Sequence, residues 1–323
     1  MSEPYVRPDV AAFLKMLEAN PRPKMTAETL PMMRPLAPQG MALLEPPIGE
    51  LAVTRDLRAP GPGGDIPLRL FDARAEREPG PVVVFCHGGG FVIGDIDTHA
   101  SMCAELARRL DVPVVSVDYR LAPENPWPAA PDDAEAAARW VAENGAALGR
   151  GVTGLVLCGD SAGANLTIVT ALALRDRPAA VPVLLQFPIY PAVDRAGDYP
   201  SGKAFSQGFG LDAVDTVFYD QAYNPDRHHW RGSPIIADLE GLPPLLLVTA
   251  GLDPLRDQGR VYAAKAVQAG VRTTYVEVPG VIHGFLGFRR VIPSAAQDFV
   301  ALAETARAML EESLAAARLS STA

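Results

Sequence analysis

The chain has 323 residues, of which 48% are hydrophobic and 21% are charged, a balance that is typical of compact globular proteins and excludes disorder as the main state. It carries 29 Lys and Arg residues against 38 Asp and Glu residues, a net charge of -9, and it has no dense basic run. This charge distribution offers no basic surface of the kind that binds nucleic acid or an anionic membrane, so we expect a small or uncharged partner.

The cysteines and the first residues indicate a cellular location. Cys86, Cys103 and Cys158 cannot all pair with one another, and their spacing is not that of metal ligands. The stretch MSEPYVRPDV lacks the charged and apolar regions of a signal peptide, and no apolar run reaches the roughly 20 residues that a membrane helix needs. We therefore expect a cytoplasmic protein with neither a disulfide framework nor a metal site.

Short apolar runs alternate with helix-like segments along most of the chain. This alternation predicts an α/β fold in which helices flank both faces of a mostly parallel sheet. A Gly- and Pro-rich turn follows the first run and predicts an antiparallel hairpin at the start. We expect eight strands, at residues 51–57, 66–71, 82–87, 112–119, 154–159, 181–187, 245–250 and 273–278. Strong helix formers predict helices at residues 129–144, 257–269 and 294–317.

Two stretches do not join this alternation. Residues 1–48 hold a short helical pattern followed by many prolines and methionines, and residues 190–240 are longer than an ordinary connection. We interpret these stretches as two parts of a helical cap. The predicted division is a cap formed by residues 1–50 and 190–240 over a core formed by residues 51–189 and 241–323.

The stretch LVLCGDSAGAN, residues 155–165, passes directly from a buried strand into the pattern G-x-S-x-G. In such a nucleophile elbow a sharp turn lifts the serine hydroxyl, here that of Ser161, clear of the sheet edge. Gly159 and Gly163 leave room for the strand-to-helix crossing, and the next helix points its positive end toward any negative charge that forms on a substrate. The motif alone leaves open a plain turn with a surface serine.

A second glycine motif, FCHGGGF at residues 85–91, also follows a buried strand and is expected at the same edge of the sheet. Three successive glycines let backbone N–H groups approach a ligand closely, as an oxyanion hole requires. A phosphate-binding loop is the competing interpretation, but neither G-x-G-x-x-G nor the lysine of a P-loop is present. A plain turn needs fewer glycines.

A serine hydroxyl needs a base to become nucleophilic, and the base needs an orienting carboxylate. Among the five histidines, His283 follows the last strand and is expected at the carboxyl edge of the sheet, near Ser161. Asp253 follows the seventh strand at the same edge. Alone, either residue is more often an ordinary loop residue. Together, in the order Ser161, Asp253, His283, they predict the triad of an α/β hydrolase.

With these motifs the chain resembles the hormone-sensitive-lipase-like serine esterases, the bacterial branch, of the α/β-hydrolase fold. The motifs HGGGF, VDYRLAPE, GDSAG, DPLRD and IHGF occur in the family's order and spacing, over residues 50–315. The chain departs from the family at Gln258, where Glu is common, and at Asn125, where His is frequent. Both departures lie outside the triad.

The resemblance implies the role of each site residue. Ser161 is the nucleophile, His283 the general base and acid, and Asp253 the carboxylate that orients it. The implied oxyanion donors are the backbone N–H groups of Gly89, Gly90 and Ala162. The resemblance also implies that the two unmatched stretches form the cap.

We expect hydrolysis of small uncharged carboxylic esters through an acyl-enzyme, without a cofactor, and the bulky apolar residues of the cap favour acyl chains of roughly four to eight carbons. Nucleic acid and membranes are not expected partners, and a homodimer stays open. An amide or formamide hydrolase with the same triad is an alternative that the sequence does not separate. A ligand receptor on the same scaffold is a second one, which the intact triad disfavours.

Overall fold

Eight strands form one sheet in the computed structural model, which describes residues 4–21 and 23–321. Their order across the sheet is β1-β2-β4-β3-β5-β6-β7-β8. The α/β fold and the eight strands predicted from the apolar runs are therefore confirmed. The strands are β1 (Val53–Gly61), β2 (Gly64–Asp72), β3 (Gly80–Cys86), β4 (Val114–Val117), β5 (Val152–Asp160), β6 (Val183–Ile189), β7 (Leu245–Leu252) and β8 (Thr273–Ile282).

The sheet begins antiparallel and becomes parallel. β1 and β2 pair as the predicted hairpin, with Leu57 opposite Leu68, and β2 also runs antiparallel to β4. All pairings from β4 through β3 to β8 are parallel, so these strands present their carboxyl ends at one edge. β4 is shorter than its predicted span of residues 112–119: its ladder with β2 ends where Val117 pairs with Leu68, and beyond it only the N–H of Asp118 still donates to the carbonyl of Pro67, at 3.0 Å.

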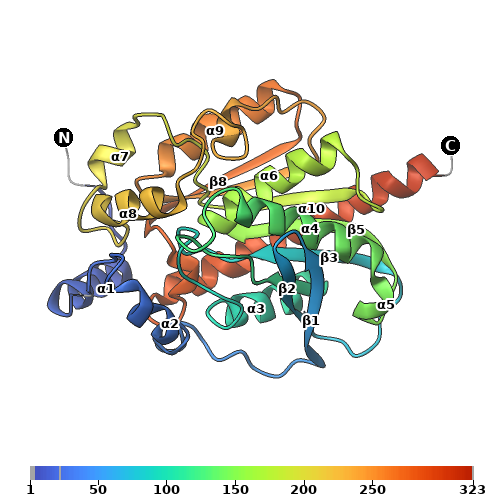
Figure 1. Ribbon diagram of the computed structural model, residues 1–323, viewed down its shortest axis with the longest axis horizontal. Helices are drawn as coiled ribbons and strands as arrows, with labels where there is room; N and C mark the ends of the chain where they lie inside the picture. Colours follow the sequence, from blue (N-terminus) through green and yellow to red (C-terminus); the bar gives the residue numbers. More distant parts are fainter. Residues whose placement is uncertain (1–3, 22, 322–323) are drawn as a thin grey trace.

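Helices cover both faces of the sheet (Figure 1). The helices of the core are α3 (Ala100–Leu110), α4 (Ala129–Glu143), α5 (Gly145–Leu148), α6 (Ala162–Asp176), α9 (Arg256–Gln268) and α10 (Pro293–Ser321). α4, α6 and α9 pack on one face, while α3 and α10 pack on the other. The inner strands are apolar along their whole length because both faces are buried, and every residue of β7 is buried.

The predicted helices agree closely with the observed ones. α4 and α9 each lie within one residue of the predicted bounds at both ends. α10 continues to Ser321, four residues beyond the predicted end, since the Ala-rich sequence there contains no helix breaker.

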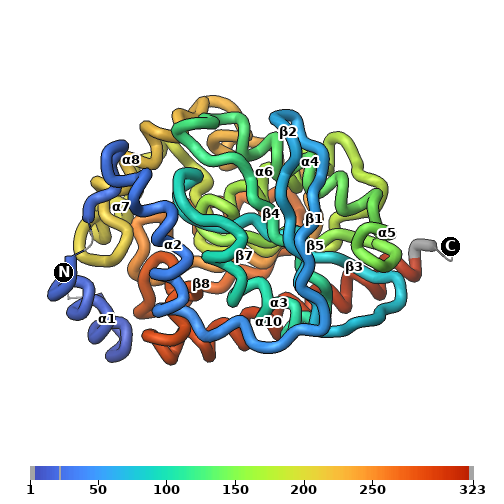
Figure 2. The backbone as a smooth tube through the Cα atoms, turned by 60° about the horizontal axis from the view of Figure 1, so that its bottom comes forward, coloured from blue at the N-terminus to red at the C-terminus, as the bar shows by residue number. Residues whose placement is uncertain are grey.

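Four further helices gather at one end of the molecule, as both Figure 1 and Figure 2 show. They are α1 (Pro8–Ala19), α2 (Leu30–Leu44), α7 (Pro200–Ala204) and α8 (Ala213–Tyr223). Short 3-10 turns, η1 (Pro234–Ile236) and η2 (Phe285–Gly287), complete the helical elements of the described residues. These four helices come from the two segments assigned to the cap, of which residues 1–3 and 22 lie outside the described part. The division into cap and core stays a prediction.

No helix in residues 4–21 and 23–321 has both the length and the apolar character that crossing a membrane requires.

Candidate active site

Ser161 stands at the turn between β5 and α6, in a backbone conformation that L-residues rarely adopt. Its φ is 53° and its ψ is -112°, and its N–H donates to the carbonyl of Ile189 at 2.8 Å. The turn requires glycine at position 163, because a Cβ there would lie 1.9 Å from the carbonyl oxygen of Cys86. The steric reason for the G-x-S-x-G pattern is thus visible, and strain at such a position is typical of functional sites.

The structure brings the three predicted triad residues together. Nε2 of His283 lies 2.7 Å from Oγ of Ser161, and Nδ1 of His283 lies 2.7 Å from Oδ2 of Asp253. Asp253 is fully buried, and its second oxygen accepts the N–H of Leu255 at 2.8 Å. These contacts form one hydrogen-bonded chain from a buried carboxylate to a hydroxyl, although they join residues 122 and 30 positions apart.

The glycine loop lies beside Ser161. Gly89 and Gly90 have φ values of 117° and 64°, which side chains disfavour. Among the described residues, no acceptor takes their N–H groups or that of Ala162, the first residue of α6. A Cβ on Gly90 would lie 2.4 Å from the ring of Tyr219, so this aromatic residue of α8 covers the loop directly.

Buried side chains hold the glycine loop in place through hydrogen bonds to its backbone. His87 bonds through Nδ1 to the carbonyl of Gly88 at 2.8 Å, and burial lowers the pKa of His87 to about 3. The hydroxyl of Tyr119 donates to the carbonyl of His87 at 2.7 Å. Asp160 accepts the N–H of Gly88 at 2.8 Å and does not contact His283 or Ser161 through its side chain. Asp160 is therefore a structural carboxylate.

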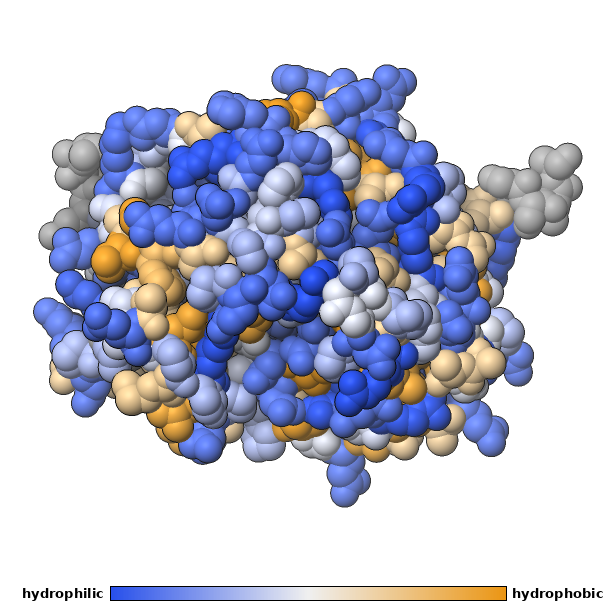
Figure 3. Space-filling model, viewed as in Figure 1, coloured by the Kyte–Doolittle hydropathy of each residue, from blue (hydrophilic) through white to orange (hydrophobic). Residues whose placement is uncertain are grey.

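Ser161 and His283 open into a hollow of about 520 Å³. One wall is α2, which contributes mainly methionine and leucine side chains, and the opposite side holds the glycine loop and Tyr219. Hydrophobic residues also gather at the surface over α2 and α8, at the left of Figure 3. The exposed apolar residues of these helices are Met32, Leu36, Leu43, Val214 and Val217. The site is thus suited to an apolar ligand.

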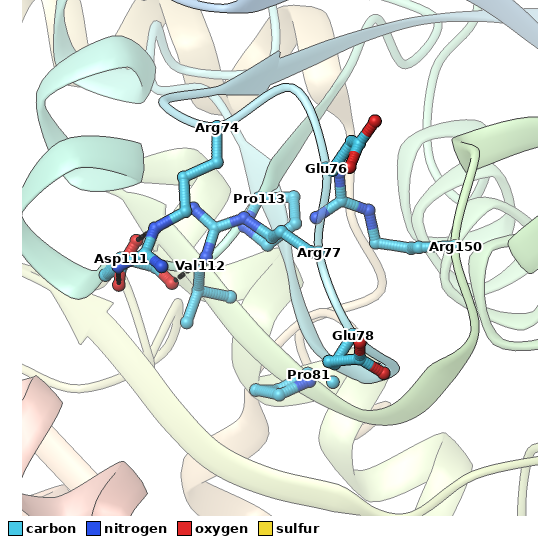
Figure 4. Close-up of a pocket in the computed structure, with 10 residues that line it drawn as sticks. Arg74, Glu76, Arg77, Glu78, Pro81, Asp111, Val112, Pro113 and Arg150 are labelled. Atoms are coloured by element: carbon cyan, nitrogen blue, oxygen red, sulfur yellow. Dashed lines mark hydrogen bonds and ion pairs between the residues drawn. The ribbon is translucent and has the colours of Figure 1, made fainter.

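A second hollow, of about 530 Å³, lies near the amino-terminal ends of β3, β4 and β5 (Figure 4). Its arginines pair with carboxylates: Nε of Arg74 lies 2.8 Å from Asp111, while Arg77 and Arg150 both pair with the buried Asp72. The lining contains no nucleophile next to a base. We therefore read it as an ion-pair cluster that anchors the β2–β3 connection, at the sheet edge opposite Ser161.

Two supporting residues were missed by the sequence reasoning or left without a role. Tyr190 directly follows β6, has a φ of 42°, and its ring centroid lies 4.9 Å from that of His283. Its position at the carboxyl end of a strand is the signal that could have pointed to it. Gln258, noted only as a departure, accepts the N–H groups of Val193 and Asp194 at 2.6 and 2.9 Å and so holds the start of the inserted segment.

Comparison with known proteins agrees with this arrangement. A family model described as the alpha/beta hydrolase fold matches residues 83–287. Carboxylesterase NlhH of Mycobacterium tuberculosis is 37% identical over 310 residues, covering 92% of this chain and 95% of the relative. An ethyl acetate hydrolase of Pseudomonas putida is 34% identical over 319 residues, covering 93% and 98%. The structure of a hyperthermophilic esterase from Pyrobaculum calidifontis superposes with a TM-score of 0.87, at 37% identity and 95% and 99% coverage.

The fold and these relatives define a serine hydrolase that acts on carboxylic esters. The chain belongs to the hormone-sensitive-lipase-like family of the α/β hydrolases, as the five sequence motifs indicated.

Proposed function

We propose that this carboxylesterase cleaves uncharged esters of short to medium acyl chains through an acyl-enzyme formed on Ser161. The observation that carries the proposal is the hydrogen-bonded chain from Asp253 through His283 to Ser161, at the floor of an apolar hollow. A hydroxyl within 2.7 Å of an imidazole nitrogen has the geometry that general-base activation requires.

In the first half of the reaction, Oγ of Ser161 attacks the ester carbonyl while Nε2 of His283 takes the hydroxyl proton. The carbonyl π electrons move onto oxygen and form a tetrahedral oxyanion. When they return, the bond to the alcohol oxygen breaks, and His283 gives its proton to that oxygen. In the second half, His283 takes a proton from water, whose oxygen attacks the acyl carbon and forms a second tetrahedral oxyanion. When this oxyanion collapses, the bond to Oγ of Ser161 breaks, His283 returns the proton to Oγ, and the acid leaves. Asp253 holds the ring and stabilises the imidazolium.

The oxyanion is the species that the site must stabilise. We propose the N–H groups of Gly89, Gly90 and Ala162 as its donors, since they lie beside Ser161 without other acceptors among the described residues. Ala162 adds the positive end of a 15-residue helix. Loss of one such donor typically costs about 10²–10³-fold in kcat.

The substrate is proposed to be small, apolar and uncharged. The lining of the hollow supports this, because four methionines and four leucines contribute most of its apolar side chains. Neither nucleic acid nor a membrane is proposed as a partner, in keeping with the net charge of -9. A cytoplasmic location and a homodimer stay predictions.

A covalent probe tests this function. An organophosphonate should label wild-type protein stoichiometrically at Ser161, as intact mass and peptide mapping would show, and Ser161→Ala should stay unlabelled. An activated short-chain aryl ester should be turned over by the wild type, and the variant should lose several orders of magnitude. Labelling at another residue contradicts the assignment. Faster cleavage of a matched aryl amide than of the ester contradicts the choice of substrate.

A further inference from the structure

A largely buried histidine and a buried carboxylate contact each other beside the glycine loop, and both line the hollow at Ser161. His99 is the N-cap of α3, and Asp160 is the last residue of β5, directly before Ser161. Nε2 of His99 lies 3.2 Å from Oδ1 of Asp160, and the same oxygen accepts the N–H of Gly88. His99 therefore reaches the loop that carries the proposed oxyanion donors through a single carboxylate.

The hydrogen bonds around His99 determine its protonation state. Thr98 has one hydroxyl proton, which it donates to the carbonyl of Asp95 at 2.7 Å. Its oxygen can then only accept at the 3.0 Å contact with Nδ1 of His99, so this ring nitrogen donates. Nε2 faces a carboxylate, which also only accepts when it is ionised. With the Thr98 hydroxyl donating to Asp95, both ring nitrogens face acceptors, and this arrangement favours an imidazolium at His99.

The surrounding charges agree with this assignment. Burial acts to lower the pKa of His99, but the charge of Asp160 and its hydrogen bond, with the charges of Glu45 and Asp95, outweigh burial and raise it. The positive N-terminal end of α3 opposes the imidazolium. Arg289 lies beyond Glu45 and pairs with it at 2.8 Å.

The neighbouring histidine behaves in the opposite way. His87 has its ring centroid 5.6 Å from that of His99, and burial with the charge of His99 keeps its pKa near 3. His87 is therefore neutral, and the positive charge facing Asp160 belongs to His99. For Asp160, burial acts to raise the pKa, but the charge of His99 and the bonds from His99 and Gly88 lower it.

We propose that His99 is a positioning residue for ester hydrolysis: its imidazolium neutralises Asp160 and holds it on Gly88, so that the oxyanion donors stay aligned beside a compensated charge. The inference rests on the proposed function. Without the His99 proton, Asp160 would present an unneutralised negative charge to the hollow in which the substrate oxyanion forms. Like charges in a poorly screened site repel, and the transition state would rise in energy.

The sign of the pH effect follows from the raised pKa. The contribution of the His99–Asp160 pair is fully present below about pH 6.5 and is lost as the pH rises through the higher pKa of the folded protein. At an effective dielectric of about 20, a unit charge at a distance on the order of 10 Å changes a rate constant on the order of tenfold. We expect kcat to fall by this factor on the alkaline side, with KM nearly constant, because the charge acts on the transition state.

Three variants test the inference. His99→Gln removes the charge while keeping an amide that can donate to Asp160, and His99→Gln/Asp160→Asn removes both charges. Asp160→Asn alone serves if the histidine variant fails to fold. His228→Gln, the same change at an exposed histidine of residues 224–233, is the matched control. Each is measured for kcat and KM from pH 6 to 10 with an aryl ester.

We expect His99→Gln to lose about tenfold in kcat near pH 7 and to lack the alkaline fall, while the double variant recovers to within about threefold of wild type. An alkaline fall that persists in His99→Gln, or a double variant no better than the single one, overturns the proposal. An alkaline fall in kcat that Asp160→Asn retains also overturns the proposal.

A histidine NMR titration separates this inference from the proposed function. The signal that disappears in His99→Gln should titrate above pH 6.5 in wild type and lower in Asp160→Asn. A neutral His99 at pH 6.5 overturns the inference even in an active enzyme. Absence of any ester turnover by wild type overturns the proposed function, while the titration still reports the charge pair.

Discussion

The length of the best acyl chain is a sharp test of the hollow beside Ser161. Its volume of about 520 Å³, divided by about 30 Å³ for a water-sized group, gives room for about 17 non-hydrogen atoms. In a nitrophenyl ester the leaving group and the carbonyl oxygen take about 11 of these, on the same water-sized scale, and leave about six for acyl carbons. We therefore expect the optimum near six carbons, inside the range of four to eight predicted from the sequence.

The slope below the optimum follows from burial of methylene groups. Each buried CH₂ contributes about 0.8 kcal/mol, which corresponds to about fourfold in kcat/KM. Four added methylenes, from acetate to hexanoate, should raise kcat/KM on the order of 200-fold. Beyond eight carbons we expect the acyl chain to meet the wall formed by α2, and the steric cost should then lower kcat/KM with each further carbon.

The assay is kcat/KM across an acyl series of nitrophenyl esters, at concentrations below micelle formation. Met41→Ala should move the optimum toward longer chains by two to three carbons, because it removes about three non-hydrogen atoms from the lining. Met16→Ala, an exposed methionine of α1 outside the lining, is the control. A rise that continues past ten carbons, or activation at an oil–water interface, would refute the argument from the volume of the hollow.

Two further predictions concern the support of the site. Asp253→Asn should lower kcat by up to about 10⁴-fold with little change in KM, because the amide no longer stabilises the His283 imidazolium; the exposed Asp238→Asn should not, and a loss below tenfold would remove Asp253 from the triad. Tyr190→Phe should stabilise the fold by about 1 kcal/mol, since the Tyr190 hydroxyl is buried without a partner among the described residues, whereas Tyr119→Phe should cost about 1 kcal/mol by removing the bond to His87. Urea unfolding of Tyr190→Phe and Tyr119→Phe measures the change in the free energy of unfolding for each variant. Equal losses in the two variants would show that the Tyr190 hydroxyl has a partner.

The sheet and the position of the predicted triad could be inferred from sequence because each depends on a local pattern. Apolar runs located all eight strands, and parallel strands bring their carboxyl ends to one edge. Ser161, Asp253 and His283 each follow a strand directly, so knowledge of the edge was enough to expect them together. Their spacing along the chain mattered less than this shared place in the fold.

Helix α2 could not be inferred in this way. Pro35 and Pro38 lie inside it, and a proline in a helix interior costs about 3 kcal/mol or more, so local propensity argues against a helix there. Tertiary contacts supply what propensity lacks: Arg34 donates to the carbonyl of Val92 at 2.6 Å and pairs with Glu124. Partners 58 and 90 positions away leave no local signal in the sequence.

The charge pair behind the glycine loop was hidden for a related reason. His99 showed only that a helix begins there, and Asp160 showed only that it stands beside the nucleophile. The positive charge on His99 depends on the Thr98 hydroxyl donating its single proton to the carbonyl of Asp95. The direction of that hydrogen bond cannot be read from the spacing of residues in the sequence. The same atoms with a free Thr98 hydroxyl would permit a neutral ring. On the proposed role of His99, the electrostatics of the glycine loop depend on one turn of backbone before α3, and we expect substitutions in that turn to alter the pH dependence of kcat without touching the predicted triad.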